Sequence, residues 1–156
     1  MVRLDIPGFG RRDLAHLVLD FNGTLAEDGR LIEGVGERLR ALARELAVHV
    51  VTADTFGRAR DELAGLPVTV QVLAGTDQSL AKRKLVEELG AASTVCIGNG
   101  RNDRLMLAAA GLGIAVVQKE GASSEAIAAA PVVARDIREA LDLLAHPRRL
   151  TATLRD

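Results

Sequence analysis

Hydrophobic residues in this chain gather in short runs that alternate with longer segments of helical periodicity. The run at 16–21 is mostly leucine, valine and phenylalanine and leads into an Asn-Gly turn, which is typical of a buried strand. In the segment 33–46, valine and leucine recur every three or four positions, which predicts an amphipathic helix. The same criteria predict further strands at 2–6, 47–51, 68–73, 93–97, 113–117 and 132–134, and further helices at 56–63, 78–89, 104–110, 123–129 and 137–145.

This alternation of strands and helices predicts an α/β fold built on a parallel sheet with right-handed connections. At 156 residues the chain is long enough for one domain with a substantial core, which we place at 15–145. We interpret 1–13 as a short strand and a Pro-Gly-Phe-Gly turn, and 146–156 as a basic polar tail. An Asp-Gly pair between apolar residues predicts a small hairpin or flap at 26–31.

Composition narrows the classes of partner. The net charge is -1, and aromatic residues make up only 2% of the chain. A nucleic-acid or anionic-membrane surface would need a basic excess, and base stacking would need aromatic side chains, so we expect neither kind of partner. The single cysteine, Cys96, lies in an apolar run and is expected to be a small buried hydrophobe. Together with the lack of a leader-like segment, this predicts a soluble cytoplasmic protein.

Polar residues stand at the carboxyl ends of three predicted strands: 20–24, Thr52 and 99–103. If these strands are neighbours, the groups converge at one sheet edge with the amine of Lys82 or Lys84, and that edge binds ligands in open α/β sheets. Carboxylates, a hydroxyl, an amine and glycine-rich turns suit Mg²⁺ together with a phosphate. Without such partners, the aspartate at the first strand end would be a simple turn residue.

The order of these residues matches a known pattern. The set Asp20-x-Asn22-Gly-Thr24, Thr52, Lys82 and Gly98-Asn99-x-x-x-Asp103 resembles the haloacid dehalogenase (HAD) superfamily of phosphohydrolases. It is more closely similar to the phosphorylation domain of P-type ATPases in soluble form, where the lysine precedes a hydrophobic-x-x-Leu-Gly stretch, as Lys82 does here. The resemblance covers about 15–145 and implies a three-layer Rossmann-like, HAD-like sheet with helices on both faces.

The resemblance also implies roles. Asp20 would be the nucleophile that forms an aspartyl-phosphate, and it would also bind Mg²⁺. Thr52 would hydrogen-bond the phosphoryl oxygens, and Lys82 would pair with both Asp20 and the phosphate, with Lys84 as the alternative lysine. The implied phosphate-binding residues are Gly23, Thr24, Thr52, Ala53 and Lys82, and the implied metal ligands are Asp20, Asn22, Asn99 and Asp103. The nearby Asp54 is expected to cap the next helix rather than line the site.

Two positions depart from the pattern. Phosphatases of the family carry an acid–base aspartate two residues after the nucleophile, where this chain has Asn22. Since an amide can neither donate nor accept that proton, turnover is expected to be slow. Asn99 replaces the first aspartate of the last motif, which removes one negative charge and is expected to weaken Mg²⁺ binding.

The gaps between motifs leave no room for the cap domain that many HAD enzymes insert. We therefore expect an open site that takes a large phosphorylated substrate or is covered by a neighbour in a homo-oligomer. The enzymatic alternative is a capless phosphatase of the 3-deoxy-manno-octulosonate 8-phosphate type, which shares this layout. The alternative outside enzymes is a non-hydrolytic phosphate- or nucleotide-binding or regulatory module, which Asn22 and Asn99 favour.

Overall fold

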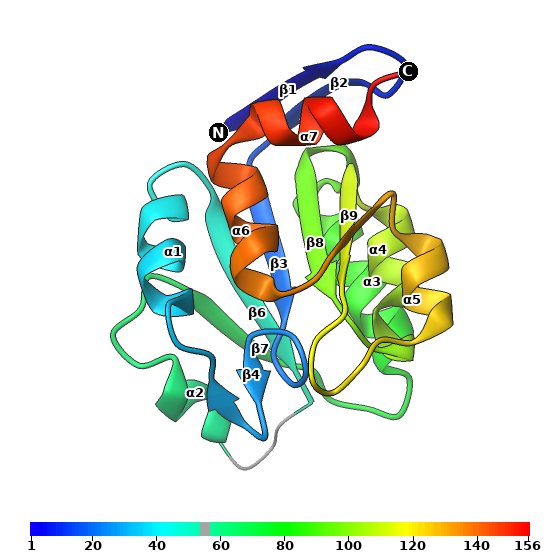
Figure 1. Ribbon diagram of the computed structural model, residues 1–156. Helices are drawn as coiled ribbons and strands as arrows, with labels where there is room; N and C mark the ends of the chain where they lie inside the picture. The colour runs from blue at the N-terminus through cyan, green and yellow to red at the C-terminus, as the bar shows by residue number, and fades with distance from the viewer. Residues whose placement is uncertain (54–56) are drawn as a thin grey trace.

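The computed structural model describes residues 1–53 and 57–156, and its centre is a six-stranded parallel sheet (Figure 1). The strand order is β10-β9-β8-β3-β6-β7, and each neighbouring pair runs parallel. The predicted α/β class is confirmed. The three strands with polar ends are neighbours, which is the condition under which their polar groups converge. The strands are β3 (His16–Asp20), β6 (Ala47–Thr52), β7 (Thr69–Val72), β8 (Thr94–Gly98), β9 (Leu112–Val116) and β10 (Val132–Ala134).

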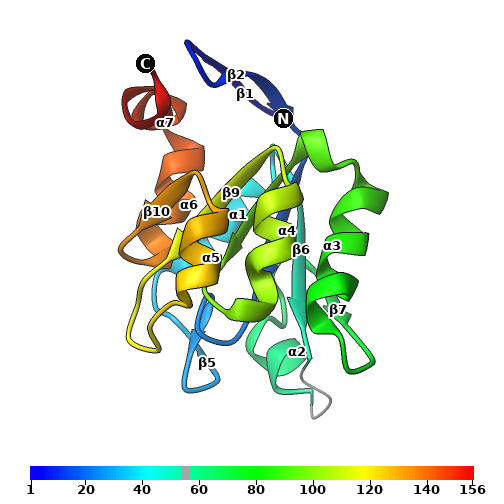
Figure 2. The same ribbon diagram turned by 90° about the vertical axis from the view of Figure 1, so that its right-hand side faces the viewer.

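Helices cover both faces of the sheet, which gives the three expected layers (Figure 2). Helices α1 and α6 lie on one face, and α3, α4 and α5 lie on the other. The helices are α1 (Val35–Leu42), α2 (Arg58–Glu62), α3 (Gln78–Leu89), α4 (Arg104–Ala109), α5 (Ser124–Ala129), α6 (Ile137–Ala145) and α7 (Pro147–Leu154), with 3₁₀ turns η1 (Ala91–Ser93) and η2 (Arg101–Asp103).

Strand β3 divides the core between the two faces. Leu17 and Leu19 pack with α1 and α6, while Val18 packs with α3, α4 and α5. Because side chains alternate along a strand, Asp20 points to the same face as Val18. The buried Cys96 belongs to this second cluster, as the sequence indicated.

Helix α1 is shorter than the predicted helix at 33–46. It begins after Gly34, whose positive φ of 82° is not helical, and it ends at Leu42. The next residues continue in turns, with the Leu46 amide donating to the Leu42 carbonyl. Within the described residues, the predicted helix at 56–63 is observed as α2, which ends at Glu62. Position 56 and Asp54 lie outside the described residues.

Both ends of the chain are more ordered than predicted. The N-terminal segment is a hairpin in which β1 (Val2–Ile6) pairs antiparallel with β2 (Gly10–Leu14), where the sequence had predicted only the first strand. The prediction of a polar tail at 146–156 is wrong, because α7 spans most of it and lies beside the hairpin (Figure 1). Its Leu150 is fully buried, so the arginines occupy only the outer face of an amphipathic helix.

The predicted flap is confirmed as the hairpin of β4 (Ala26–Glu27) and β5 (Arg30–Leu31). Its turn residues, Asp28 and Gly29, both have positive φ, which a two-residue hairpin turn requires. In the parts of the chain that are described, only this flap and α1 separate β3 from β6, and no inserted domain covers the sheet edge. None of the described helices has both the length and the apolar character needed to cross a bilayer.

Candidate functional site

A buried lysine lies between two aspartates at the carboxyl edge of the sheet. The Lys82 Nζ donates to Asp20 Oδ1 and to Asp103 Oδ1, each at 2.7 Å. Lys82 is 1% exposed, Asp20 7% and Asp103 0%. These three charged groups come from β3, α3 and the turn after β8, so the fold assembles what the sequence separates by more than 80 positions.

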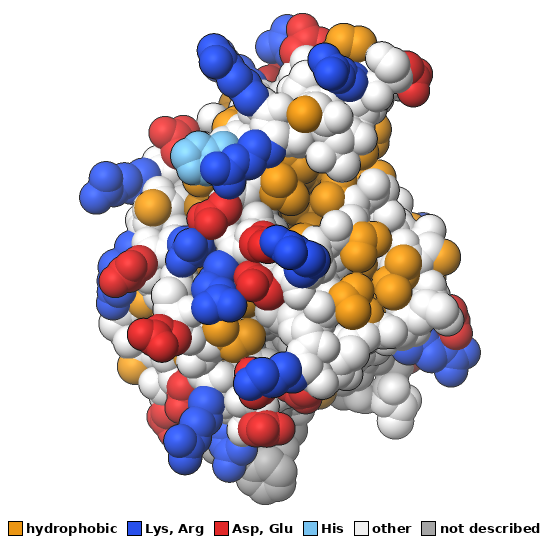
Figure 3. Space-filling view, in the orientation of Figure 1, with side chains coloured by type: hydrophobic (Ala, Val, Ile, Leu, Met, Phe, Trp, Pro, Cys, Tyr) orange, Lys and Arg blue, Asp and Glu red, His pale blue; other side chains and the backbone are white. Residues whose placement is uncertain are grey.

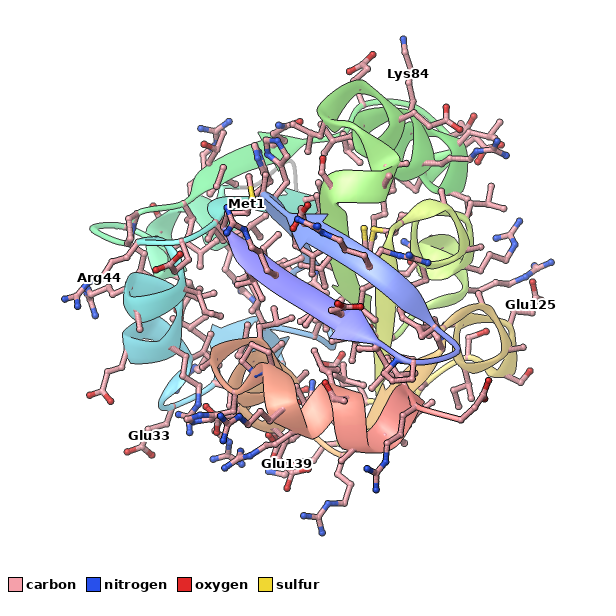
Figure 4. All side chains as sticks on the ribbon, turned by 90° about the horizontal axis from the view of Figure 1, so that it is seen from above. Met1, Glu33, Arg44, Lys84, Glu125 and Glu139 are labelled. Atoms are coloured by element: carbon pink, nitrogen blue, oxygen red, sulfur yellow. The ribbon has the colours of Figure 1, made fainter. Side chains whose placement is uncertain are left out.

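Helix α3 delivers the lysine because of its spacing. Ser79, Lys82 and Val86 are buried on the face that packs against the sheet. Lys84 projects outward from the same helix, as Figure 4 shows, and approaches Glu88 at 3.7 Å. The geometry therefore places Lys82, rather than Lys84, beside Asp20.

The turn after β8 holds Asp103 from the other side. Its Oδ2 accepts hydrogen bonds from the backbone amides of Asn99 and Gly100 at 3.0 and 2.8 Å. Gly98 permits this approach, since a Cβ there would lie 2.6 Å from the Asp103 Cγ. The carboxylate thus has three charge-assisted or backbone donors, which compensates its complete burial.

The two Asn-Gly motifs meet in space. The Thr24 hydroxyl lies 3.2 Å from both Asp20 Oδ2 and Asn99 Oδ1. Gly23 has φ +78°, and a Cβ at this position would lie 2.5 Å from the Asn99 Nδ2. Glycine is required here both by the left-handed backbone and by the close approach of the asparagine.

The remaining predicted residues lie at the same edge. Thr52 ends β6 next to β3 and is 2% exposed, and Ala53 follows it at the surface. Asn22 is exposed, at the rim of the loop that follows Asp20. Arg101, in the last motif, is also exposed and pairs with Glu125 at 2.8 Å.

Burial dominates the electrostatics of the site. It raises the pKa of Asp20 from 3.8 to about 7, with a further upward contribution from the Asp103 charge and opposing contributions from Lys82 and Thr24. Burial by itself lowers the pKa of Lys82, but the two carboxylates outweigh it and hold that pKa above its usual value. The lysine therefore stays charged at neutral pH and donates hydrogen bonds to both carboxylates.

The donor set at this edge fits a hard divalent cation. Asp20 offers a carboxylate with one oxygen turned away from Lys82, and Asn99 offers an amide oxygen close by. Among residues 1–53 and 57–156, no three His, Cys, Asp or Glu side chains gather in a metal-binding arrangement. Oxygen donors with so few carboxylates suit Mg²⁺, which retains waters and substrate oxygens in its shell.

The sequence did not point to Gln118, which follows β9. Its Nε2 donates to the carbonyls of Gly23 and Thr24 at 3.0 and 2.9 Å, and its Oε1 accepts from the Ile137 amide at 2.8 Å. One signal could have identified it, because Gln118 is the first polar residue after a buried strand, like the predicted site residues.

A pocket of about 450 Å³ lies between the flap, the loop after β9 and the start of α6, and Gly23 forms part of its lining. Charged side chains of both signs line it, including Glu27 and Lys119, which form a salt bridge of 2.7 Å. Figure 3 shows acidic and basic side chains interspersed over the face that carries α6 and the flap.

No family model matches the chain. An uncharacterised protein of Methanocaldococcus jannaschii is 46% identical over 83 residues, which make up 51% of this chain and 89% of that protein. This chain and the archaeal protein therefore belong to one family.

Solved structures of similar fold show what this chain resembles. A protein of Streptomyces avermitilis described as a HAD family hydrolase superposes with a TM-score of 0.69 and 26% identity, over 87% of each chain. The 3-deoxy-D-manno-octulosonate 8-phosphate phosphatase of Moraxella catarrhalis, in complex with magnesium, phosphate and the sugar acid, gives a TM-score of 0.74 over 90% of this chain and 91% of its own. At 18% identity, that second likeness concerns the fold alone.

Fold and site together define a Rossmann-like α/β protein with a buried Asp–Lys–Asp cluster at the carboxyl edge of its sheet. The chain belongs to the HAD-like superfamily of hydrolases, in its capless form. The roles of the individual residues remain predictions.

Proposed function

We propose that this protein is a Mg²⁺-dependent phosphohydrolase that works through an aspartyl-phosphate on Asp20. The observation that carries this proposal is the contact of Asp20 with a fully buried lysine that also holds Asp103. A charged lysine at this place neutralises the carboxylate as an anionic phosphate approaches. Asp20 keeps one oxygen for the reaction, next to the Thr24 hydroxyl.

In the first step, an Asp20 oxygen attacks the phosphorus of a phosphomonoester, and the bond to the leaving oxygen breaks. In the second step, a water oxygen attacks the aspartyl-phosphate, releasing inorganic phosphate and restoring the carboxylate. Lys82, Thr24 and Thr52 would hold the phosphoryl oxygens during both steps. Mg²⁺ would be held by Asp20, the Asn22 carbonyl, Asn99 and Asp103, and it would neutralise charge on the phosphoryl group.

Asn22 replaces the residue that transfers protons in the related phosphatases. The leaving alkoxide must gain a proton, and the attacking water must lose one, but the Asn22 amide can do neither. Position 22 therefore supplies neither proton transfer, and its exposed rim leaves solvent to exchange the protons there. Loss of a general acid–base group at this position lowers the rate by about 10²- to 10⁴-fold.

Because dephosphorylation is slow, the aspartyl-phosphate form of the protein would persist, as in the P-type ATPase domains that the motifs resemble. The alternative is a phosphate-binding or regulatory module without turnover. Asn22 and Asn99, at the two positions that depart from the family pattern, favour it. A sugar-acid phosphatase of the Moraxella type is the enzymatic alternative, supported by the shared capless fold. Because the sheet edge is open, the site could bind a macromolecular substrate, or a second copy of the chain could cover it.

The test uses purified protein, Mg²⁺ and either 4-nitrophenyl phosphate or acetyl phosphate. We expect slow phosphate release and a phosphoprotein that is stable in acid and cleaved by hydroxylamine, both absent in Asp20→Asn. Replacing the missing group with Asn22→Asp is expected to raise turnover by about 10²- to 10⁴-fold.

Thr76→Asp is the control, because it adds the same charge to an exposed residue in the loop after β7, outside the residues assigned to the site. It should leave turnover near that of the wild type. If neither the wild-type protein nor Asn22→Asp releases phosphate or forms the phosphoprotein, the phosphohydrolase proposal is wrong and the binding-module alternative replaces it.

A further inference from the structure

The Gln118 side chain connects the loop after Asp20 to a different part of the fold. It follows β9 and is half-buried beside Gly23. Its two amide hydrogens reach the carbonyls of Gly23 and Thr24, and its oxygen accepts from the first amide of α6, that of Ile137. Both donors and the oxygen of one side chain therefore connect two segments that lie more than 100 residues apart.

The orientation of this amide is determined by its partners. A backbone N–H can only donate, so the atom that faces Ile137 must be the oxygen. Two carbonyl oxygens can only accept, so the atom that faces Gly23 and Thr24 must be the NH₂ group. No other standard side chain of this length offers two donors at one end of the group and an acceptor at the other.

The two carbonyls that Gln118 holds lie on either side of Thr24. Each peptide group is planar, so fixing the Gly23 carbonyl fixes the plane that contains the Thr24 nitrogen, and fixing the Thr24 carbonyl fixes the following plane. Gln118 thereby restrains both φ and ψ of Thr24. The hydroxyl of that residue is the group that reaches Asp20 and Asn99.

The turn that begins at Gln118 also holds Asn99. The Gly121 amide donates to the Gln118 carbonyl at 2.8 Å, and the Gly121 carbonyl accepts from the Asn99 Nδ2 at 3.1 Å. Gly23 is thus enclosed between the Gln118 amide on one side and the Asn99 amide on the other. The turn after β9 therefore makes hydrogen bonds to both Asn-Gly motifs of the site, at 22–23 and at 99–100.

We propose that Gln118 is a positioning residue, which fixes the 22–24 loop so that the Thr24 hydroxyl is directed at Asp20. This inference rests on the proposed phosphohydrolase function for its effect on rate, but not for its effect on the loop. Gln118 acts through Thr24, because its side chain donates to the loop carbonyls and not to Asp20.

The Gln118→Glu variant distinguishes positioning of the 22–24 loop from stabilisation of the start of α6. A glutamate oxygen still accepts from the Ile137 amide, and its negative charge suits a helix N-terminus. The carboxylate cannot donate, however, and it turns an oxygen toward two carbonyl oxygens. A residue that only supports α6 would tolerate this change, whereas a residue that positions the loop would not.

Gln78→Glu is the matched control. The Gln78 Nε2 also donates to two backbone carbonyls, those of Leu73 and Gly75, at 3.1 and 2.9 Å. The substitution therefore removes the same pair of hydrogen bonds and adds the same charge, but in a loop that does not contact Thr24.

The experiment combines hydrogen exchange with steady-state kinetics on 4-nitrophenyl phosphate and Mg²⁺. In Gln118→Glu we expect faster exchange of the Leu25 and Ala26 amides, which both donate to the Phe21 carbonyl in the wild-type loop. The Ile137 amide should keep its protection. We expect kcat to fall by about 10- to 100-fold with little change in KM, as for other groups that orient a site from outside it. Gln78→Glu should show neither effect.

Equal exchange and equal kcat in Gln118→Glu and Gln78→Glu would overturn the inference, and so would loss of protection at Ile137 alone. Should Gln118→Glu fail to fold, Gln118→Met gives the same loop readout with an apolar side chain of similar length. If the wild-type protein has no turnover, the proposed function fails, and the exchange data still decide whether Gln118 positions the loop.

Discussion

Removing the buried ammonium group with Lys82→Met tests the electrostatics of the site most directly. Lys82 is the shared partner of two aspartates that are almost fully buried. Two carboxylates roughly 5 Å apart repel by about 3 kcal/mol at an effective dielectric constant of about 20. Breaking a buried ion pair by removing one partner costs about 3 to 5 kcal/mol. We therefore expect the free energy of unfolding of the metal-free protein to fall by about 3 to 5 kcal/mol at pH 8.

The pH dependence gives this prediction its sign. The pKa of Asp20 in the folded protein is about 7, above the value of 3.8 for the free group. A raised carboxyl pKa means that the folded state binds more protons at this group. The contribution of Asp20 to stability is therefore greatest below its ordinary pKa and is lost as the pH rises through 7. Lys82 lowers this pKa, so its removal raises the pKa further and steepens the loss.

The assay is urea unfolding in the presence of EDTA at pH 5 and pH 8, followed by circular dichroism. Lys84→Met is the control, since Lys84 lies on the same helix with its side chain 77% exposed, and it should change stability by less than about 0.5 kcal/mol. The difference between Lys82→Met and wild type should be larger at pH 8 than at pH 5. Equal stability of the two lysine variants, or a difference that grows toward pH 5, would refute the reasoning.

Three further predictions concern stability. Asp20→Asn removes one of two repelling carboxylates and should stabilise the metal-free protein at pH 8 by about 1 to 4 kcal/mol in urea unfolding, given the raised pKa of Asp20. Asn99→Asp turns an oxygen toward the Gly121 carbonyl and should destabilise the metal-free protein by about 1 to 3 kcal/mol, while calorimetry should show tighter Mg²⁺ binding. Leu150→Ala empties a fully buried position on α7 and should lower the free energy of unfolding by about 2 to 5 kcal/mol.

Each has an outcome that would contradict it. A destabilised Asp20→Asn protein would mean that Lys82 more than compensates both carboxylates. An Asn99→Asp protein as stable as wild type would mean that the Gly121 contact contributes nothing. For α7, the control is Leu154→Ala at a half-buried position, and equal losses in the two variants would contradict the packing described for Leu150.

The local pattern of apolar residues was sufficient to predict most strands of the sheet. Apolar runs such as the one before Asp20 form strands because they must be buried on both faces, and polar residues follow these strands where the runs end. The amphipathic helix at Gln78–Leu89 was predicted with its observed bounds. The ends of the chain were not, because a hairpin strand such as β2 carries mostly polar residues and α7 has only a narrow apolar face.

The sequence by itself determined the α/β class, the flap and the set of residues at the ligand-binding edge, because each depends on local periodicity or on the place where a strand ends. Only the tertiary structure decided between Lys82 and Lys84, since burial depends on which helix face meets the sheet. Only it could reveal Gln118, whose three hydrogen bonds join residues about 95 positions before it and 19 after it. Such contacts depend on the packing of whole elements, and no local pattern in the chain records them.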